Sequence, residues 1–297
     1  MNRISDLATP SATLEILERF HINPTKSLGQ NFLVNDTVVR KILDMAEVGE
    51  DESILEVGPG IGTLTNALLK QAYMVTSIEK DPKLPEVLEH TLASLQGRFK
   101  LIQKDAIDLK AEDFAKPLPT KLVANLPYAV AATLVLEYFQ RFEHLDEATV
   151  MVQKEVAQRM AADPGNKNYG AYTVKLSLYA KPVDSFDVSR NDFMPKPHVD
   201  STVIRLKRNT EILDAYPKDV VHAAAIMADA AFASRRKTLS NSCKAFFSGH
   251  GEAGTKVTEC LPALFEKSLV DGSVRGETLD TEDYLRMGEA LLACTKE

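Results

Sequence analysis

The stretch ILEVGPGIG, residues 54–62, joins a short apolar run to a turn that contains Gly58, Gly60 and Gly62. The run 54–57 predicts a buried strand, and a helical pattern follows at 63–71. Glycines in the turn allow a tight bend and let a ligand approach the backbone closely. Open parallel sheets bind ligands beyond the carboxyl ends of their strands, which is the position of this turn. The stretch therefore predicts a strand–turn–helix unit that holds a ligand.

Short apolar strands alternate with helical patterns on both sides of this unit. The predicted strands are 54–57, 75–78, 101–103, 121–124 and 149–152, and the predicted helices are 36–46, 63–71, 84–95 and 132–139. This alternation is typical of a doubly wound, largely parallel sheet, so the predicted fold class is α/β. Two further strands, 183–188 and 202–206, are expected to close the sheet, with the Pro-rich loop 193–198 between them.

The two ends of the chain carry helical patterns. Residues 1–25 are expected to form an N-terminal helical extension, with Thr9 as the cap and Pro10 in the first turn, and a polar loop follows at 26–33. From Pro217 onward the predicted helices are 218–232, 235–247 and 280–293. We therefore expect one domain at residues 1–207 and a small, all-helical C-terminal domain at residues 208–297.

Composition limits the class of protein. No apolar run is long enough to span a bilayer, and the N-terminus lacks a secretory signal pattern, so we expect a cytoplasmic protein without a membrane partner. The cysteines at positions 243, 260 and 294 are odd in number and fit neither a disulfide framework nor a metal knuckle. The sequence accordingly predicts a reducing compartment and no metal site.

The net charge of −7 argues weakly against a nucleic acid as partner. The charge is uneven, however: residues 205–250 hold eight Lys and Arg against four Asp and Glu, whereas residues 251–297 hold five against ten. Local basic faces decide phosphate binding more than net charge does. The net charge is therefore only a weak argument against a nucleic-acid partner.

Two acids follow the next two strands after the glycine turn. Glu79 ends the second strand and Asp105 follows the third. A carboxylate at the first position suits ribose hydroxyls, and one at the second suits an adenine amino group. Either acid alone fits a solvated loop equally well, and the glycine turn alone also fits an NAD site. Thr63 stands where the dinucleotide fingerprint requires a small residue, and the second acid, Asp105, is the more telling detail. S-adenosylmethionine therefore fits better than NAD.

A third strand end carries the tetrapeptide Asn125-Leu126-Pro127-Tyr128. The Asn side chain offers an acceptor and donors at short reach. The proline pushes Leu126 away from helical geometry, so its carbonyl is expected to point out of the strand. The Tyr ring offers a flat face on which a base can stack, although a half-buried core tyrosine is the commoner role. These features indicate a site for a planar exocyclic amine.

Seven short motifs follow one another along the chain: Gln30–Leu33, Glu56–Gly60, Ile78–Asp81, Asp105–Ala106, Asn125–Tyr128, Gln153–Val156 and Phe193–Ser201. Together they resemble the ribosomal RNA adenine dimethyltransferase family, and within it the bacterial branch that modifies small-subunit (16S) RNA. The resemblance is strong over residues 26–206 and weaker over 232–239, which is similar to the basic start of the family's helical C-terminal domain. His198 and the segment 129–133 depart from the usual family pattern.

The resemblance implies a Rossmann-like, S-adenosylmethionine-dependent methyltransferase sheet with an antiparallel final strand. It implies cofactor contacts at Gln30, Asn31, Leu33, Gly58, Gly60, Glu79, Asp105, Ala106 and Asn125. It implies that Asn125, Leu126, Pro127, Tyr128 and Phe193 form the catalytic site, in which the two aromatic rings grip the target base. It also implies RNA binding by Arg235, Arg236 and Lys237. A loop anchor is the alternative role for Phe193, and a solvated helix face is the alternative for the basic cluster.

The implied reaction is dimethylation of the exocyclic amines of two adjacent adenosines near the 3′ end of small-subunit RNA. The implied partner is an immature 30S particle, and nothing in the sequence suggests an obligate dimer. Two alternatives are a large-subunit RNA dimethyltransferase of the macrolide-resistance type and a ribosome-assembly factor without turnover. The first usually has a shorter C-terminal domain and Ile at the position of Leu126, and an intact Asn125 and Glu79 argue against the second.

Overall fold

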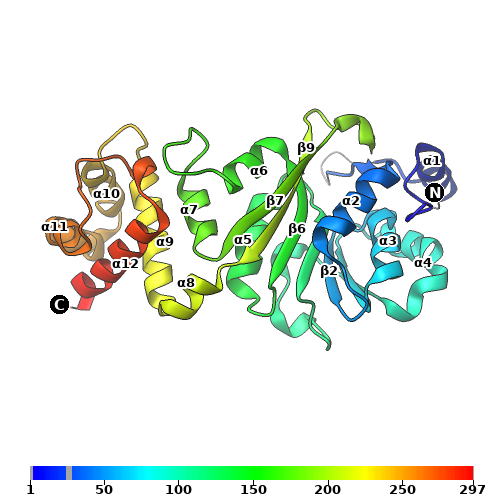
Figure 1. Ribbon diagram of the computed structural model, residues 1–297, viewed down its shortest axis with the longest axis horizontal. Helices are drawn as coiled ribbons and strands as arrows, with labels where there is room; N and C mark the ends of the chain where they lie inside the picture. Colours follow the sequence, from blue (N-terminus) through cyan, green and yellow to red (C-terminus); the bar gives the residue numbers. More distant parts are fainter. Residues whose placement is uncertain (1–2, 25–28, 297) are drawn as a thin grey trace. The chain divides into compact units, whose positions relative to one another are not determined.

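The computed structural model describes residues 3–24 and 29–296, and the chain divides into two compact units (Figure 1). The sheet unit comprises Met1–Ala157 and Pro182–Arg208, and the helical unit comprises Gln158–Lys181 and Asn209–Glu297. Residues 26–28 of the predicted polar loop lie outside the described residues. No helix in the described part of the chain is long and apolar enough to cross a membrane.

The sheet unit is built on a seven-stranded sheet in the order β4-β3-β2-β5-β6-β9-β7. Its strands are β2 Ser53–Val57, β3 Met74–Glu79, β4 Phe99–Gln103, β5 Lys121–Asn125, β6 Glu147–Gln153, β7 Ala180–Val188 and β9 Ser201–Arg208. Strands β2 to β6 pair in parallel, and β9 pairs antiparallel with β6. The α/β prediction is confirmed, and each predicted strand lies within one of these strands.

A second, two-stranded sheet was not predicted. It pairs β1, Phe32–Leu33, antiparallel with β8, Phe193–Met194, and Leu33 stands opposite Phe193. The two strands come from the predicted polar loop and the predicted Pro-rich loop. Pairing between segments so far apart in the chain depends on the tertiary fold, so local sequence gives no signal for it.

Helices flank the sheet as the alternating pattern requires. They are α1 Pro10–Arg19, α2 Asp36–Ala46, α3 Thr63–Gln71, α4 Leu84–Thr91, α5 Ala131–Arg141 and α6 Lys154–Met160. The hydroxyl of Thr9 accepts a hydrogen bond from the Ala12 amide at 3.1 Å, which confirms the predicted cap of α1. The predicted helix 84–95 is shorter, because α4 gives way after Thr91 to the 3-10 helix η2, Ala93–Arg98.

The core of the sheet unit positions the glycine turn. Helices α2 and α3 pack against each other (Figure 1), and their apolar faces pack on the sheet in one buried cluster. Helix α1 buries Ile16 and Leu17 against Ile61 of the turn. The N-terminal segment adds a hydrogen bond of 2.7 Å from the Ser5 hydroxyl to the Thr63 carbonyl. Packing on both sides therefore holds the turn at the end of β2.

The helical unit contains α7 Ala171–Ser177, α8 Thr210–Ala215, α9 Lys218–Phe232, α10 Leu239–Phe247, α11 Gly251–Ser268 and α12 Thr281–Lys296. Helix α9 matches its prediction, whereas α10 begins at Leu239 and not at residue 235. Helix α11 was not predicted. It contains Gly251, Gly254 and Pro262, residues that oppose helix formation and mask the periodic pattern of the apolar positions.

Residues 158–181 differ from the predicted domain division, which placed them in the first domain. Val174 and Leu178 are buried in the apolar cluster of the helical unit. The buried Tyr169 hydroxyl donates a hydrogen bond of 2.8 Å to the Leu279 carbonyl. The segment therefore packs with the C-terminal helices, although it precedes the last strands of the sheet in sequence.

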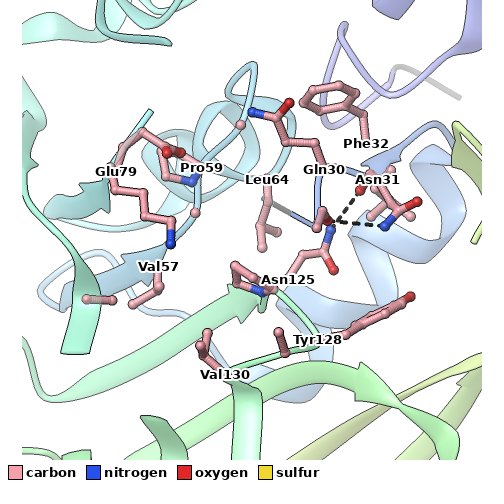
Figure 2. A pocket seen from close by; sticks show the side chains of 18 of the residues that line it. Gln30, Asn31, Phe32, Val57, Pro59, Leu64, Glu79, Asn125, Tyr128 and Val130 are labelled. Atoms are coloured by element: carbon pink, nitrogen blue, oxygen red, sulfur yellow. Dashed lines mark hydrogen bonds between the residues drawn. The ribbon is translucent and has the colours of Figure 1, made fainter. Parts of the chain in front are cut away.

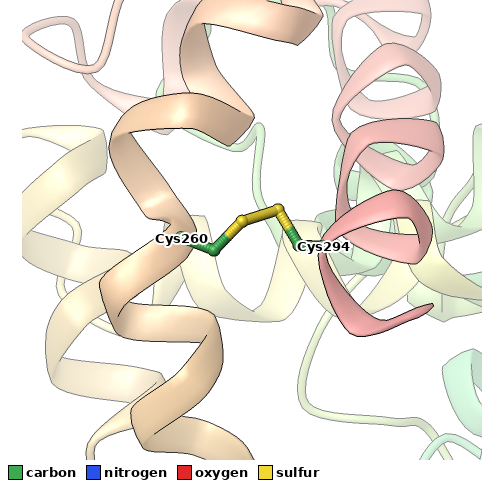
Figure 3. The surroundings of a disulfide bond; sticks show 2 residues. All are labelled: Cys260 and Cys294. Carbon is green, nitrogen blue, oxygen red and sulfur yellow. A yellow bond between two sulfur atoms is a disulfide. The ribbon is translucent and has the colours of Figure 1, made fainter. Parts of the chain in front are cut away.

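The prediction of a chain without disulfides is wrong. Cys260 on α11 and Cys294 on α12 form a disulfide with a Cα–Cα distance of 6.2 Å (Figure 3). The disulfide could not be predicted from the spacing of the cysteines, because it depends on the side-by-side packing of α11 and α12. Cys243 is buried and free.

Candidate active site

A cavity of about 740 Å³ opens at the carboxyl ends of the parallel strands of the sheet unit (Figure 2). Its wall brings together most of the residues that the sequence predicted for the site. They are Gln30, Asn31, Leu33, Gly58, Gly60, Glu79, Asp105, Ala106, Asn125, Pro127 and Tyr128. In the described part of the chain no group of His, Cys, Asp and Glu residues could hold a metal ion.

The glycine turn forms one side of the cavity. Gly58 and Gly60 have φ values of +71° and +60°, a backbone region in which side chains with a Cβ are strained. A Cβ on Gly60 would also lie 3.1 Å from a ring carbon of Phe32. The Gly58 amide donates to the Ile78 carbonyl at 2.9 Å, which ties the turn to the end of β3. The turn thus requires glycine at both positions.

Glu79 lies beside this turn and is only 7% exposed. Burial raises the pKa of its carboxyl group, and backbone N–H groups, including those of Asp81 and Gly60, oppose that rise. The Asp81 amide donates to Glu79 at 2.8 Å, and the Gln30 side chain donates to the Asp81 carboxylate at 2.8 Å. The carboxylate is therefore held in one orientation at the cavity wall.

Asp105 occupies the next strand end, as predicted. One carboxylate oxygen accepts the Ile107 amide at 3.1 Å, which caps the 3-10 helix η3, Ala106–Asp108. The other oxygen lies 3.4 Å from the ammonium group of Lys80. Asp105 and Lys80 are both partly exposed, so the ion pair contributes little energy and mainly orients the carboxylate.

Glu56 is a third acid in the cavity wall, and its chemistry was not predicted. It is 1% exposed, and one of its oxygens accepts hydrogen bonds of 2.7 Å from both Thr65 and Ser77. Burial raises the pKa of Glu56 to about 7, against the lowering effect of the two hydroxyls. An acid inside an otherwise apolar strand was the sequence signal that could have found it.

Asn125 ends β5 and faces the cavity. Its side-chain amide nitrogen donates to the Asn31 carbonyl at 3.2 Å (Figure 2). This bond fixes the amide plane and leaves the Oδ1 atom without a donor among the described residues. An acceptor held at the cavity wall can receive an N–H group of a bound molecule.

Tyr128 is half-buried and lines the cavity. Its hydroxyl and the Ser201 hydroxyl share a hydrogen bond of 2.6 Å. Burial raises the pKa of the Tyr128 phenol, so this group stays protonated at neutral pH. The role of Ser201 was not predicted, because it depends on β9 lying close to the tetrapeptide in space.

Two predicted catalytic residues, Leu126 and Phe193, are not among the residues that line the cavity, and the predicted outward direction of the Leu126 carbonyl stays a prediction. Leu126 is 1% exposed, and its amide donates to the Met151 carbonyl at 3.1 Å. Phe193 is 4% exposed and packs in the apolar cluster that contains Leu33. The alternative role of Phe193 as a loop anchor therefore agrees with its surroundings. Of the two aromatic residues predicted to grip the base, Tyr128 lines the cavity and Phe193 does not.

The predicted basic cluster forms an exposed turn between α9 and α10 of the helical unit. Arg235 pairs with Glu277 at 2.9 Å. Arg236 and Lys237 are exposed and have no ion-pair partner among the described residues. These two side chains are free to meet a polyanion.

Comparisons with known proteins agree with this geometry. Residues 22–286 match the family model described as "Ribosomal RNA adenine dimethylase". A "Ribosomal RNA small subunit methyltransferase A" of Corynebacterium diphtheriae is 38% identical over 295 residues, 97% of each chain. A protein of the same name from Listeria monocytogenes is 38% identical over 298 residues, 98% of this chain and 99% of the relative.

Solved structures show the same fold. A dimethyladenosine transferase from Plasmodium falciparum is similar with a TM-score of 0.72 and 26% identity, over 86% of this chain and 95% of that one. The 23S rRNA methyltransferase ErmE is similar with a TM-score of 0.65 and 25% identity, over 88% and 99%. These findings confirm the predicted enzyme class and the Rossmann-like fold. The chain belongs to the ribosomal RNA adenine dimethylase family.

Proposed function

We propose that this protein transfers methyl groups from S-adenosylmethionine to the exocyclic N6 amines of two adjacent adenosines near the 3′ end of small-subunit ribosomal RNA. The observation that carries the proposal concerns Asn125, which lines a cavity bounded by the glycine turn and two fixed carboxylates and whose Oδ1 has no donor among the described residues. The curated relatives with 38% identity over nearly the whole chain are named for the small subunit, which supports this choice of RNA.

The chemistry of the cavity wall suits the proposed cofactor. Glu79 offers a buried carboxylate for ribose hydroxyls, and Asp105 with Ala106 lies one strand further, where an adenine would follow its ribose. The glycine turn keeps side chains out of the space beside them. When bound, S-adenosylmethionine supplies a methyl group already activated by a positively charged sulfur.

Asn125 supplies the acceptor for the target amine. The N6 lone pair of adenine is delocalised into the ring, so the amine is a weak nucleophile. A hydrogen bond from N6–H to Asn125 Oδ1 favours a pyramidal nitrogen, and it strengthens as positive charge develops on that nitrogen. Because the interaction is stronger in the transition state than in the ground state, it lowers the barrier. No strong general base is required before the attack.

Tyr128 supplies the surface for the base. The target adenine must leave its stack to enter a cavity, and an aromatic face compensates for the lost stacking. The hydrogen bond to Ser201 holds the phenol ring at one edge and keeps its face available. Pro127 lies on the wall between Asn125 and Tyr128 in sequence, and its ring restricts the backbone that joins them.

Arg236 and Lys237 supply phosphate contacts on the helical unit. These two exposed cations, without an ion-pair partner in the described part of the chain, are the local basic face that a chain of net charge −7 requires for RNA binding. We propose an immature small subunit as the substrate particle, a monomeric enzyme and a cytoplasmic location, since ribosomal RNA matures there.

The test is methyl transfer by the purified protein. We expect radiolabelled S-adenosylmethionine to label the RNA of small subunits from a strain that lacks this gene, and Asn125→Ala protein to label it about 10²- to 10³-fold more slowly. Label in large-subunit RNA alone would contradict the proposal and favour a reaction like the one named for ErmE. Binding to small subunits without any transfer would favour an assembly factor.

A further inference from the structure

Helix α5 connects the tetrapeptide to the loop after Asp105. The helix spans Ala131–Arg141 and begins directly after the tetrapeptide, with Val130 as its N-cap. Val130 and Leu134 line the cavity, and Tyr138 and Arg141 continue the same face at positions i+8 and i+11 from Val130. One face of α5 therefore runs from the target side of the cavity to the loop that holds Asp105.

Tyr138 and Arg141 donate hydrogen bonds to the main chain of that loop. The Tyr138 hydroxyl donates to the Ala106 carbonyl at 2.8 Å. The Arg141 guanidinium donates to the Ile107 carbonyl at 3.1 Å and to the Leu109 carbonyl. Three of the four carbonyls between Ala106 and Leu109 are thus bonded by side chains of one helix.

The hydrogen bond from Tyr138 to Ala106 is the buried one of these three. Its ring is fully buried and meets Phe142 edge to face, so packing alone fixes the ring position. Phenylalanine would keep that packing and remove only the hydroxyl. The Ala106 carbonyl would then keep only the Leu109 amide as a donor, at 3.4 Å, and the loop would lose its short, buried hydrogen bond to α5.

From these contacts we infer that Tyr138 is a positioning residue for the adenine end of the cofactor site. Its hydroxyl holds Ala106, and through it Asp105, at the distance from the glycine turn that a bound adenosine requires. The inference rests on the proposed function, because it assumes that the adenine lies beside Asp105 and Ala106. Tyr138 itself does not line the cavity and touches no reacting atom.

The experiment compares Tyr138→Phe with a matched control in the full-length protein. Tyr169 is a second buried tyrosine whose hydroxyl donates to a main-chain carbonyl at 2.8 Å, but it lies in the helical unit. Tyr169→Phe therefore removes the same kind of hydrogen bond away from the cavity. Calorimetry with S-adenosylhomocysteine and with 5′-methylthioadenosine, which lacks the amino-acid end, measures binding, and steady-state kinetics separate KM for the cofactor from kcat.

We expect Tyr138→Phe to raise Kd about three- to tenfold for both ligands, the effect of losing one hydrogen bond. We expect a parallel rise in KM for the cofactor, an unchanged kcat, and normal binding by Tyr169→Phe. Unchanged affinity in Tyr138→Phe, an equal loss in Tyr169→Phe, or a loss confined to S-adenosylhomocysteine would overturn the inference. Wild-type protein that binds neither ligand would contradict the proposed cofactor as well as this inference. The preceding outcomes would contradict the inference alone, so the two failures can be told apart.

Discussion

The side-chain amide of Asn125 donates a hydrogen bond to the main-chain oxygen of Asn31 at 3.2 Å. This single bond joins two motifs that stand far apart in the sequence, and it sets which end of the Asn125 side chain faces the cavity. With the nitrogen engaged, the oxygen is the atom presented to a bound amine. The proposed chemistry follows from that orientation.

Replacement of Asn125 by Ala removes the acceptor and the bond to Asn31. We expect transfer to fall by about 10²- to 10³-fold, the usual effect of losing one preorganised transition-state contact. We expect cofactor affinity to fall by no more than about tenfold, since one ordinary hydrogen bond is lost. Single-turnover transfer and calorimetry measure the two effects, with the exposed Asn191→Ala as control. Complete loss of cofactor binding would assign Asn125 a different main role.

Replacement of Tyr128 by Ala removes the ring on which the base is proposed to stack. Stacking is worth about 1–3 kcal/mol per base, so we expect kcat/KM for the RNA to fall by about 5- to 150-fold. Tyr128→Phe keeps the ring and loses only the bond to Ser201, and it should retain most of the activity. Tyr73→Ala removes an exposed ring and serves as control. If Tyr128→Ala and Tyr73→Ala had equal, wild-type rates, Tyr128 would be a packing residue.

The glycine turn and the tetrapeptide show how far the sequence predicts this molecule. Gly58, Gly60, Glu79 and Asp105 follow short apolar runs, and parallel strands bring their carboxyl ends to one edge, so local pattern was sufficient to place them on one cavity. The bounds of helix α9 could also be predicted from the sequence, because no residue inside it opposes helix formation. Patterns of this kind depend on neighbours in the sequence.

Contacts between distant segments were not predictable in the same way. Phe193 was expected at the target base, but pairing of β8 with β1 places its ring in the core beside Leu33. The Cys260–Cys294 disulfide depends on the packing of α11 against α12, and α11 was itself hidden by Pro262. In each case the missing information was which elements meet in space.

The buried acid Glu56 predicts a pH dependence of stability. Its pKa rises from 4.5 to about 7 on folding, so the folded state holds the proton more tightly than the unfolded state does. The free energy of unfolding should therefore fall as pH rises from 4.5 to about 7, by at most about 3 kcal/mol from this group. Glu56→Gln has no charge to bury and keeps an acceptor for Thr65 and Ser77.

Denaturant unfolding of wild type and Glu56→Gln between pH 5 and pH 8 measures this effect as a difference of slopes. We expect Glu56→Gln to be the more stable protein at the alkaline end and to show the flatter profile. The exposed Glu15→Gln serves as control and should follow the wild type. Parallel profiles for wild type and Glu56→Gln would show that the buried carboxyl does not titrate in this range.

The Cys260–Cys294 disulfide predicts a redox dependence of stability in the helical unit. The two cysteines are 34 residues apart, and closing a loop of that length stabilises a folded unit by about 3–4 kcal/mol. We expect a reductant to lower the Tm of wild type and to leave Cys260→Ser unchanged. Thiol titration of the denatured protein without reductant should find Cys243 alone. Three titratable thiols and an unchanged Tm would contradict the bond.

Arg236 and Lys237 predict a salt-dependent part of RNA binding. Removing either side chain should weaken binding to all RNA sequences and lower the salt slope of log K by about 1. Lys267→Ala removes an exposed cation from the acidic C-terminal segment and should leave the slope unchanged. Fluorescence anisotropy with a small-subunit RNA fragment at several salt concentrations measures the slopes. Equal slopes for all variants would assign the basic turn to the solvated surface.

The most direct test of the central claim is the position of the modified bases in cells. Mass spectrometry of small-subunit RNA is compared between a strain that lacks this gene and the same strain carrying the wild-type gene. The account predicts that two adjacent N6,N6-dimethyladenosines near the 3′ end are missing from the first strain and present in the second. Their presence in both strains, or a change found only in large-subunit RNA, would contradict it.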